Sequence, residues 1–174
     1  MKVLPTPIEG AWIVETMEVK DSRGSFYRAF CDYDLRSFLE HRVIQQANIS
    51  RTERVGAIRG LHYQRLPFIE MKLVRCLRGR VWDVVLDLRP LSKTYRQWHA
   101  EELSAADARM MVIPEGCAHG FQVLREGSEL LYLHTALYTP ESEIGVRFDD
   151  PAFGINWPLS ITDVSRRDMS HPLW

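Results

Sequence analysis

The feature that most restricts the fold of this chain is a series of short apolar or alternating segments separated by turn residues. Strands are expected at residues 11–17, 55–64, 98–103, 110–113, 119–123 and 129–138, and a hairpin at 72–89 that turns at Arg78-Gly79-Arg80. Helical spacing is confined to residues 32–41, with a single capped turn at 104–107. Because these helices cannot cover a parallel sheet, the pattern predicts an all-β antiparallel sandwich or barrel, with jelly rolls among the main choices.

A chain of 174 residues is expected to form a single domain, here residues 1–174, with a core that needs no disulfides. Its three cysteines are odd in number and lack any Cys-x-x-Cys spacing, which is typical of packing residues in a reducing compartment. The segment after Asp149 is rich in proline, serine and aspartate. We expect this segment to form a tail wrapped on the sandwich.

The charge balance argues against several classes of partner. Lys and Arg number 22 against 23 Asp and Glu, so no global basic field attracts nucleic acid or an anionic membrane. Pro5, Pro7 and Glu9 interrupt the apolar run that a signal peptide needs, and no run approaches transmembrane length. We therefore expect a cytoplasmic protein whose partners include neither nucleic acid nor a membrane.

Strand alternation groups several titratable side chains, because residues two apart share a face. In the segment LLYLHTALY it places Tyr132, His134 and Tyr138 together. Around His62 it places Arg59 on the opposite face. A face of this kind either lines a cavity or forms an ordinary solvated surface.

The usual signatures of metal and nucleophile chemistry are missing. Histidine-based metal sites commonly use a His-x-His pair, but Gln64 follows two positions after His62 and Phe121 two positions after His119. The sequence also lacks a Gly-x-Ser-x-Gly elbow, a P-loop and a GxGxxG fingerprint. We therefore expect no metal centre, and the markers of acyl transfer, nucleotide hydrolysis and hydride transfer are not present.

A set of motifs in a consistent order resembles the dTDP-4-dehydrorhamnose 3,5-epimerase family. The motifs are Arg59-Gly-Leu-His62-Tyr-Gln64, Lys72-Leu-Val-Arg75, Val84-Val-Leu-Asp87-Leu-Arg89, Ile113-Pro-Glu-Gly116, Ala118-His119-Gly-Phe121, Leu130-Leu-Tyr132 and Ser165-Arg-Arg-Asp168. The resemblance implies a cupin-like jelly-roll subunit with a few short helices, a homodimer, and an isomerase that uses no cofactor. Its substrate would be a nucleotide-linked 4-keto-6-deoxyhexose used in deoxysugar and surface-polysaccharide (O-antigen) synthesis.

The resemblance also assigns roles to individual residues. His62 would be the base that removes the proton next to the ketone, with Asp168 orienting its imidazole. Lys72 would stabilise the enolate oxygen, and Tyr132 would return a proton from the opposite face of the sugar. Residues that would contact the substrate are Arg23, Arg28, Gln46, Asn48, Arg59, His119 and Tyr138.

Two departures from the family pattern concern specificity. Arg28 stands where the family usually has a glutamate that reads thymine, and a guanidinium offers no acceptor. This exchange leads to the hypothesis that the nucleotide is CDP; the competing interpretation is that Arg28 faces solvent and another group reads thymine. His134 replaces part of a Lys-Thr-Thr segment beside Tyr132, which leaves open whether carbon 3 alone or both carbons 3 and 5 are inverted.

Two other functions remain alternatives at this stage. A cupin ketoisomerase acting on a similar sugar nucleotide would also use His and Tyr, but the motifs around Arg59 and Lys72 favour an epimerase. A non-catalytic jelly roll would use His62 and Tyr132 only to hydrogen-bond a sugar nucleotide. The two are separable, because a binder keeps its ligand without exchanging any carbon-bound hydrogen.

Overall fold

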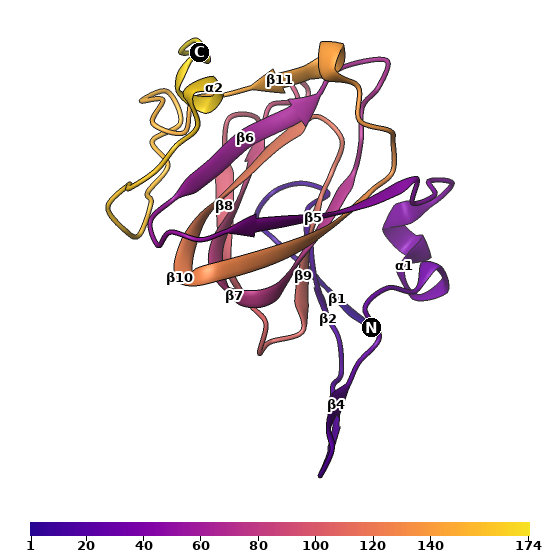
Figure 1. Cartoon of the computed structure of the whole chain (residues 1–174). Helices are drawn as coiled ribbons and strands as arrows, with labels where there is room; N and C mark the ends of the chain where they lie inside the picture. Colours follow the sequence, from indigo (N-terminus) through magenta and orange to yellow (C-terminus); the bar gives the residue numbers. More distant parts are fainter.

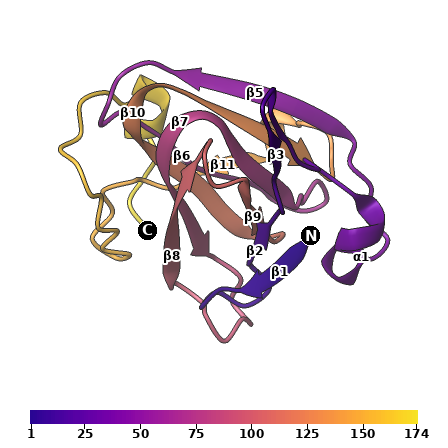
Figure 2. The ribbon, with the colours of Figure 1, turned by 90° about the horizontal axis from the view of Figure 1, so that it is seen from below.

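The computed structural model describes all 174 residues, Met1–Trp174, and its strands wrap around a common interior (Figures 1 and 2). The strands are β1 (Lys2–Pro5), β2 (Trp12–Glu15), β3 (Val19–Asp21), β4 (Gly24–Phe26), β5 (Gln46–Thr52), β6 (Ile58–Gln64), β7 (Lys72–Asp87), β8 (Trp98–Ser104), β9 (Arg109–Ile113), β10 (Cys117–His134) and β11 (Glu143–Gly145). The helices are α1 (Asp32–Leu39), α2 (Arg166–Met169) and the single 3₁₀ turn Pro140–Ser142. This is the all-β jelly-roll sandwich with a few short helices that the sequence predicts.

Two long antiparallel strands, β7 and β10, run through both layers of the sandwich. The first half of β7 pairs with β9, whereas its second half pairs with β8. In the same way β10 pairs first with β6 and then with β5. The inner core lies between the layers and includes Val74, Val85, Phe121 and Leu130, each no more than 1% exposed. Both layers therefore share one rigid pair of strands.

The hairpin predicted at Gly79 is wrong, because residues 72–87 form one strand whose two halves both pair with β10. Gly79 has a φ of 77° and marks a bend within the strand. Opposite it, the hydroxyl of buried Ser128 accepts from the Arg80 amide at 3.0 Å and donates to the Arg80 carbonyl at 3.1 Å. In the same way β10 runs without a break from Cys117 to His134, so it contains the predicted strand 119–123 and the first part of the predicted strand 129–138, which ends four residues earlier than expected.

The outer face of one layer is covered by α1, close to its predicted bounds. Leu35, Phe38 and Leu39 of the helix are buried against β2, β7 and β9. Asp32 and Asp34 lie in the first turn, where negative charge is favourable to the helix dipole. The capped turn predicted at residues 104–107 forms a turn closed by the Ser104 hydroxyl, which accepts from the Ala106 amide at 3.1 Å, but no helix.

The outer face of the other layer is covered by the segment after Asp149, which confirms the expected tail. Phe153 packs into a cluster with residues of β6, β7 and β10. Buried Gln122 ties the tail down through both its amide atoms, which bond the backbone of Leu159 at 2.9 and 3.0 Å. The tail then crosses beside β6, where Val164 bridges Ile58, and ends in α2. The tail thus brings Asp168 to the edge of β6.

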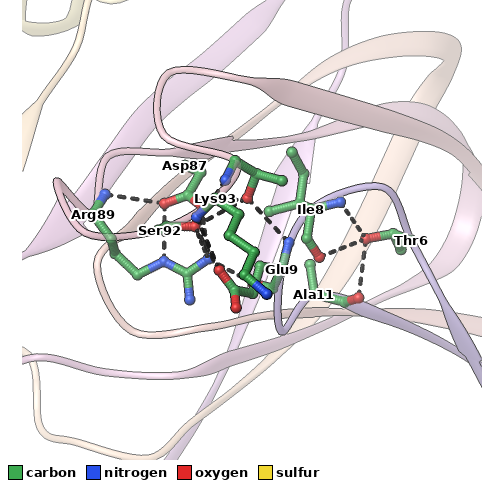
Figure 3. Close-up of polar contacts among 9 residues, drawn as sticks. Thr6, Ile8, Glu9, Ala11, Asp87, Arg89, Ser92 and Lys93 are labelled. Atoms are coloured by element: carbon green, nitrogen blue, oxygen red, sulfur yellow. Dashed lines mark hydrogen bonds and ion pairs between the residues drawn. The ribbon is translucent and has the colours of Figure 1, made fainter.

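A dense polar network links the loop between β1 and β2 to the loop between β7 and β8 (Figure 3). Buried Asp87 accepts from Arg89 at 2.7 Å, from Ser92 at 2.5 Å and from Thr94 at 2.6 Å. Glu9 joins the network, since its carboxylate accepts from the Lys93 amide at 3.1 Å. Burial acts to raise the pKa of Asp87, but the bonds from Arg89, Ser92 and Thr94 outweigh it and hold that pKa well below its usual range.

A two-stranded hairpin, β3 and β4, extends away from the body of the subunit (Figure 1). It carries Val19 and Phe26, which are 62% and 76% exposed, and Met17 before it is 84% exposed. We call residues 17–27 the arm. None of the helices is long and apolar enough to cross a lipid bilayer.

Candidate active site

A cavity of about 510 Å³ opens on the face formed by β5, β6, β10 and the tail. The predicted site residues that line it are Asn48, Arg59, His62, Lys72, His119, Tyr132, Tyr138 and Asp168. The expected alternation is confirmed for Tyr132 and His134 of β10, which both line the cavity, whereas Tyr138 lines it from beyond the end of β10 at His134. Residues from four strands and the tail therefore converge on one space.

His62 and Asp168 form a pair across 106 positions of sequence. Nε2 of His62 lies 2.8 Å from Oδ1 of Asp168, whose side chain is 5% exposed. The other oxygen of Asp168 accepts from the Gly60 amide at 3.2 Å, and the Ser165 hydroxyl caps α2 by accepting from the Asp168 amide at 3.0 Å. Burial acts to raise the pKa of Asp168, but the hydrogen bond and charge of His62 outweigh it, so the net pKa is lowered.

A β-bulge at Gly60 puts Arg59 in the same cavity as His62, which corrects the alternation expected from the sequence. His62 is opposite His119 and Arg59 is opposite Phe121, so β6 has one residue more than β10 between these pairs. Gly60 has a φ of 118°, and a Cβ there would collide with the backbone of His119 and Gly120. The Arg59 guanidinium is braced by Thr52, with its Nε donating to the Thr52 hydroxyl at 2.8 Å.

Lys72 lies at the start of β7 with its ammonium group beside the histidine. Nζ donates to the carbonyl of His62 at 3.1 Å and pairs with Oε1 of Glu70 at 3.3 Å. The second oxygen of Glu70 lies 2.8 Å from Nδ1 of His134. All three side chains of the Lys72, Glu70 and His134 group are at most 12% exposed, so the positive charge at Lys72 is held in a largely dry wall.

Tyr132 lies on β10 between two histidines, His119 and His134. Its ring stacks on His134 with centroids 5.9 Å apart and meets the edge of His119 at 5.7 Å. His119 is anchored by Asp83, its Nε2 lying 2.8 Å from Oδ1 of that buried carboxyl group. Burial, followed by the charge of Asp83, raises the pKa of Tyr132 well above its ordinary value, so the phenol stays protonated.

The second ring nitrogen of His62 faces an acidic residue that the sequence analysis did not select. Nδ1 lies 3.9 Å from Oε1 of Glu143. Glu143 is held by Tyr138, whose hydroxyl donates to it at 2.8 Å, and by an ion pair with Arg167. Burial acts to raise the pKa of Glu143, but Arg167 and Tyr138 outweigh it and lower that pKa. Since Nε2 is engaged by Asp168, Nδ1 is the nitrogen left to accept a proton.

Three predicted substrate contacts, Arg23, Arg28 and Gln46, do not line this cavity. Arg23 lies in the arm, where it pairs with Asp21 at 2.6 Å, and Arg28 pairs with Asp34 at 3.0 Å. Arg23 lies in the turn of the hairpin that leads away from the sandwich and Arg28 follows that hairpin, and neither lines the cavity of its own subunit. Gln46 instead holds the backbone of a cavity residue, because its side-chain oxygen accepts from the Tyr138 amide at 3.0 Å.

Several cavity residues were not selected from the sequence. Glu70 lies in the loop before β7, Glu143 begins the short strand β11, which the sequence did not predict, and Arg167 lies in α2. His171 was also missed, yet possible ligand atoms of His62, Asp168 and His171 all lie within 4.8 Å of one another. These three side chains form a group that could hold a metal ion. They are far apart in the sequence, so no His-x-His pattern predicts the group.

Comparisons with known proteins agree with this geometry. Residues 5–174 match the family model described as dTDP-4-dehydrorhamnose 3,5-epimerase. A protein of that name from Salmonella typhimurium is 39% identical over 175 residues, covering 99% of this chain and 95% of the relative.

Solved structures show the same architecture. RmlC from Legionella pneumophila, a dTDP-6-deoxy-D-glucose-3,5-epimerase in complex with dTDP-4-keto-L-rhamnose, superposes with a TM-score of 0.93 at 37% identity, covering 99% of this chain and 92% of that one. ChmJ, a 3'-monoepimerase from Streptomyces bikiniensis in complex with dTDP-quinovose, gives a TM-score of 0.91 at 33% identity, covering 98% and 86%. The chain therefore belongs to the dTDP-4-dehydrorhamnose 3,5-epimerase family and is an isomerase of the epimerase class.

Proposed function

We propose that this chain inverts carbons 3 and 5 of a dTDP-linked 4-keto-6-deoxyhexose by removing and returning a proton. The chain would act as a single domain, in the cytoplasm, in the synthesis of deoxysugars. The observation that carries the proposal is the bond from the Lys72 ammonium to the carbonyl of His62 at 3.1 Å. It fixes the oxyanion-stabilising charge next to the base, so one sugar can touch both. Tyr132 lines the same cavity from β10.

The chemistry needs only this chain's side chains. Nδ1 of His62 takes the carbon-bound proton while Asp168 holds Nε2 and stabilises the imidazolium. The electrons of the broken C–H bond move into the ketone, and Lys72 stabilises the enolate oxygen. Tyr132, protonated because burial raises its pKa, then donates a proton to the opposite face of that carbon. Solvent restores both protonation states, so the reaction consumes no oxidant or reductant.

The choice of dTDP rests on the relatives rather than on Arg28. The sequence led to the CDP hypothesis because Arg28 replaces an acceptor. Arg28 lies outside the cavity lining and is engaged by Asp34, which does not favour a contact to cytosine within one subunit. Side-by-side titration with dTDP and CDP decides between them: we expect tighter binding of dTDP, and a clear preference for CDP would revive the cytosine hypothesis.

We also propose a homodimer in which the arm docks on a second copy of this chain. Such a contact would cover the exposed Val19 and Phe26 of the arm. It would also bring Arg23, in the turn of the arm between β3 and β4, to the cavity of the second copy. Light scattering should give twice the chain mass. Phe26→Asp should shift the protein toward monomer, with Tyr33→Asp on the surface of α1, where the ring is also exposed, as the matched control.

Proton NMR in deuterium oxide tests the activity directly. With dTDP-4-keto-6-deoxyglucose we expect deuterium at carbons 3 and 5, whereas deuterium at carbon 3 alone would indicate a single-centre epimerase. His62→Asn should bind dTDP normally and exchange at least 100-fold more slowly, with exposed His41→Asn as the control. Unchanged exchange in His62→Asn would overturn the assignment. A ketone that migrates would indicate a ketoisomerase, and binding without exchange in the unmodified protein would indicate a non-catalytic binder.

A further inference from the structure

His171 presents an unpartnered nitrogen to the pair formed by His62 and Asp168. Its Nε2 is buried and makes no hydrogen bond, and it lies 4.0 Å from Oδ1 of Asp168. A buried polar atom without a partner costs roughly 1–3 kcal/mol. Such atoms are rare in folded proteins and call for an explanation, of which an ion is one.

The position of the His171 ring is built into the fold. Gly145 of β11 pairs with His62 of β6, and a Cβ at Gly145 would occupy the space of the His171 imidazole. The absence of a side chain at Gly145 therefore seats the ring beside His62, at a centroid distance of 6.0 Å and an interplanar angle of 76°. The two imidazoles and the carboxylate of Asp168 face one gap.

From this arrangement we propose that His62, Asp168 and His171 form a regulatory site for a divalent transition-metal cation, with Zn²⁺ as the best match. Two imidazoles and one carboxylate are a common zinc ligand set, with bonds of about 2.0–2.2 Å. Ligand atoms around such an ion lie roughly 3–4 Å apart. The 4.0 Å between His171 and Asp168 already fits, and the 2.8 Å between His62 and Asp168 opens by a small side-chain rotation.

The charge at the site suits a cation, because Asp168 supplies a carboxylate whose side chain is only 5% exposed. Glu143, 3.9 Å from Nδ1 of His62, adds negative charge at the edge of the site.

Metal binding here would switch off the proposed reaction, and this consequence alone rests on the proposed function. The cation takes the lone pair of Nε2, so the proton that Nε2 shared with Asp168 moves to Nδ1. An imidazole with a metal on Nε2 and a proton on Nδ1 has no lone pair left to accept the sugar proton. Zn²⁺ would therefore compete with the catalytic state of His62 without touching Lys72 or Tyr132.

The test uses the purified protein with CoCl₂ and ZnCl₂ alone. Co²⁺ titration, followed by its visible absorption, should show a saturable tetrahedral spectrum that Zn²⁺ displaces. His171→Gln should weaken the affinity for both ions at least tenfold, while exposed His41→Gln leaves it unchanged. His171→Asn serves as a second variant if the glutamine does not fit over Gly145, and melting curves confirm that each variant is folded.

An activity measurement then separates the two proposals. Zn²⁺ should inhibit proton exchange in the unmodified protein, and the Zn²⁺ concentration that halves the exchange rate should be at least tenfold higher in His171→Gln than in the unmodified protein. Absence of a saturable Co²⁺ spectrum up to millimolar concentrations, or equal affinity in the unmodified and His171→Gln proteins, would overturn the metal site. If the protein shows no exchange at all, the proposed function fails but the spectroscopic result still stands.

Discussion

Oε2 of Glu70 lies 2.8 Å from Nδ1 of His134, and this contact connects the catalytic candidates Lys72 and Tyr132. The other oxygen of Glu70 pairs with Lys72 at 3.3 Å, and the ring of His134 stacks on Tyr132. The positions of the ammonium and the phenol are therefore set by one shared pair of side chains. His134 departs from the family pattern in the sequence, but the sequence does not identify its partner Glu70.

His134→Phe tests this connection through stability. The new ring keeps the stacking on Tyr132 but leaves one oxygen of buried Glu70 unpaired, which should lower the free energy of unfolding by about 1–3 kcal/mol. In a Glu70→Gln background the same change should cost less, because an unpaired amide is less costly to bury than a carboxylate. Urea unfolding of the four proteins gives the coupling energy; a coupling of zero would mean that the pair does not act together.

Tyr132→Phe should separate proton removal from inversion. His62 and Lys72 remain, so deuterium exchange should continue, but the proton returns to the face from which it came. Loss of the acid is expected to slow formation of the inverted sugar roughly 100- to 10,000-fold. Chiral analysis of the product alongside NMR exchange rates provides the measurement, and an undiminished yield of inverted sugar would remove Tyr132 from its role.

Asp87→Asn should weaken the protein in a pH-dependent way. The lowered pKa of Asp87 in the folded state means that its carboxylate adds stability above its unfolded pKa of about 3.9, and that this contribution disappears as pH falls below that value. At neutral pH the substitution should cost about 3 kcal/mol. The difference between variant and unmodified protein should shrink as the acid range is entered. A constant difference in melting experiments from pH 7 to pH 3 would contradict this account.

Gly79→Ala should destabilise the bend of β7. The backbone there has a φ of 77°, and a Cβ would press on Ser128, so a loss of about 1–3 kcal/mol is expected. Gly154→Ala is the matched control, since Gly154 also has a positive φ, 57°, but open space around it. A larger loss at Gly79 than at Gly154 isolates the collision with Ser128, and equal losses would leave only the backbone conformation.

The strand pattern predicted the fold class because alternation and turn residues are local signals. Local signals also predicted the bounds of α1 and the tail that packs on the sandwich after Asp149. The continuity of β7 through Gly79 could not be predicted, since it depends on pairing with β10 rather than on the residues at the bend. A glycine between two apolar runs has the same appearance in a hairpin turn and in a bent strand.

The candidate site was partly predictable for the same reason. Motif resemblance selected His62, Lys72, Tyr132 and Asp168, and the structure gathers all four at one cavity. Arg59 joined His62 only because the bulge at Gly60 adds a residue, which alternation does not reveal. Glu70 lies in the loop before β7, Glu143 begins the short strand β11 and His171 follows α2, so their positions in space are decided by tertiary packing.

The tail has a consequence for how the protein matures. Its residue 168 is synthesised 106 positions after the histidine that it orients, so a ribosome-bound chain that has emerged only as far as β10 holds an imidazole without its carboxylate. The carboxylate that pairs with His62 is therefore added only when translation has reached α2.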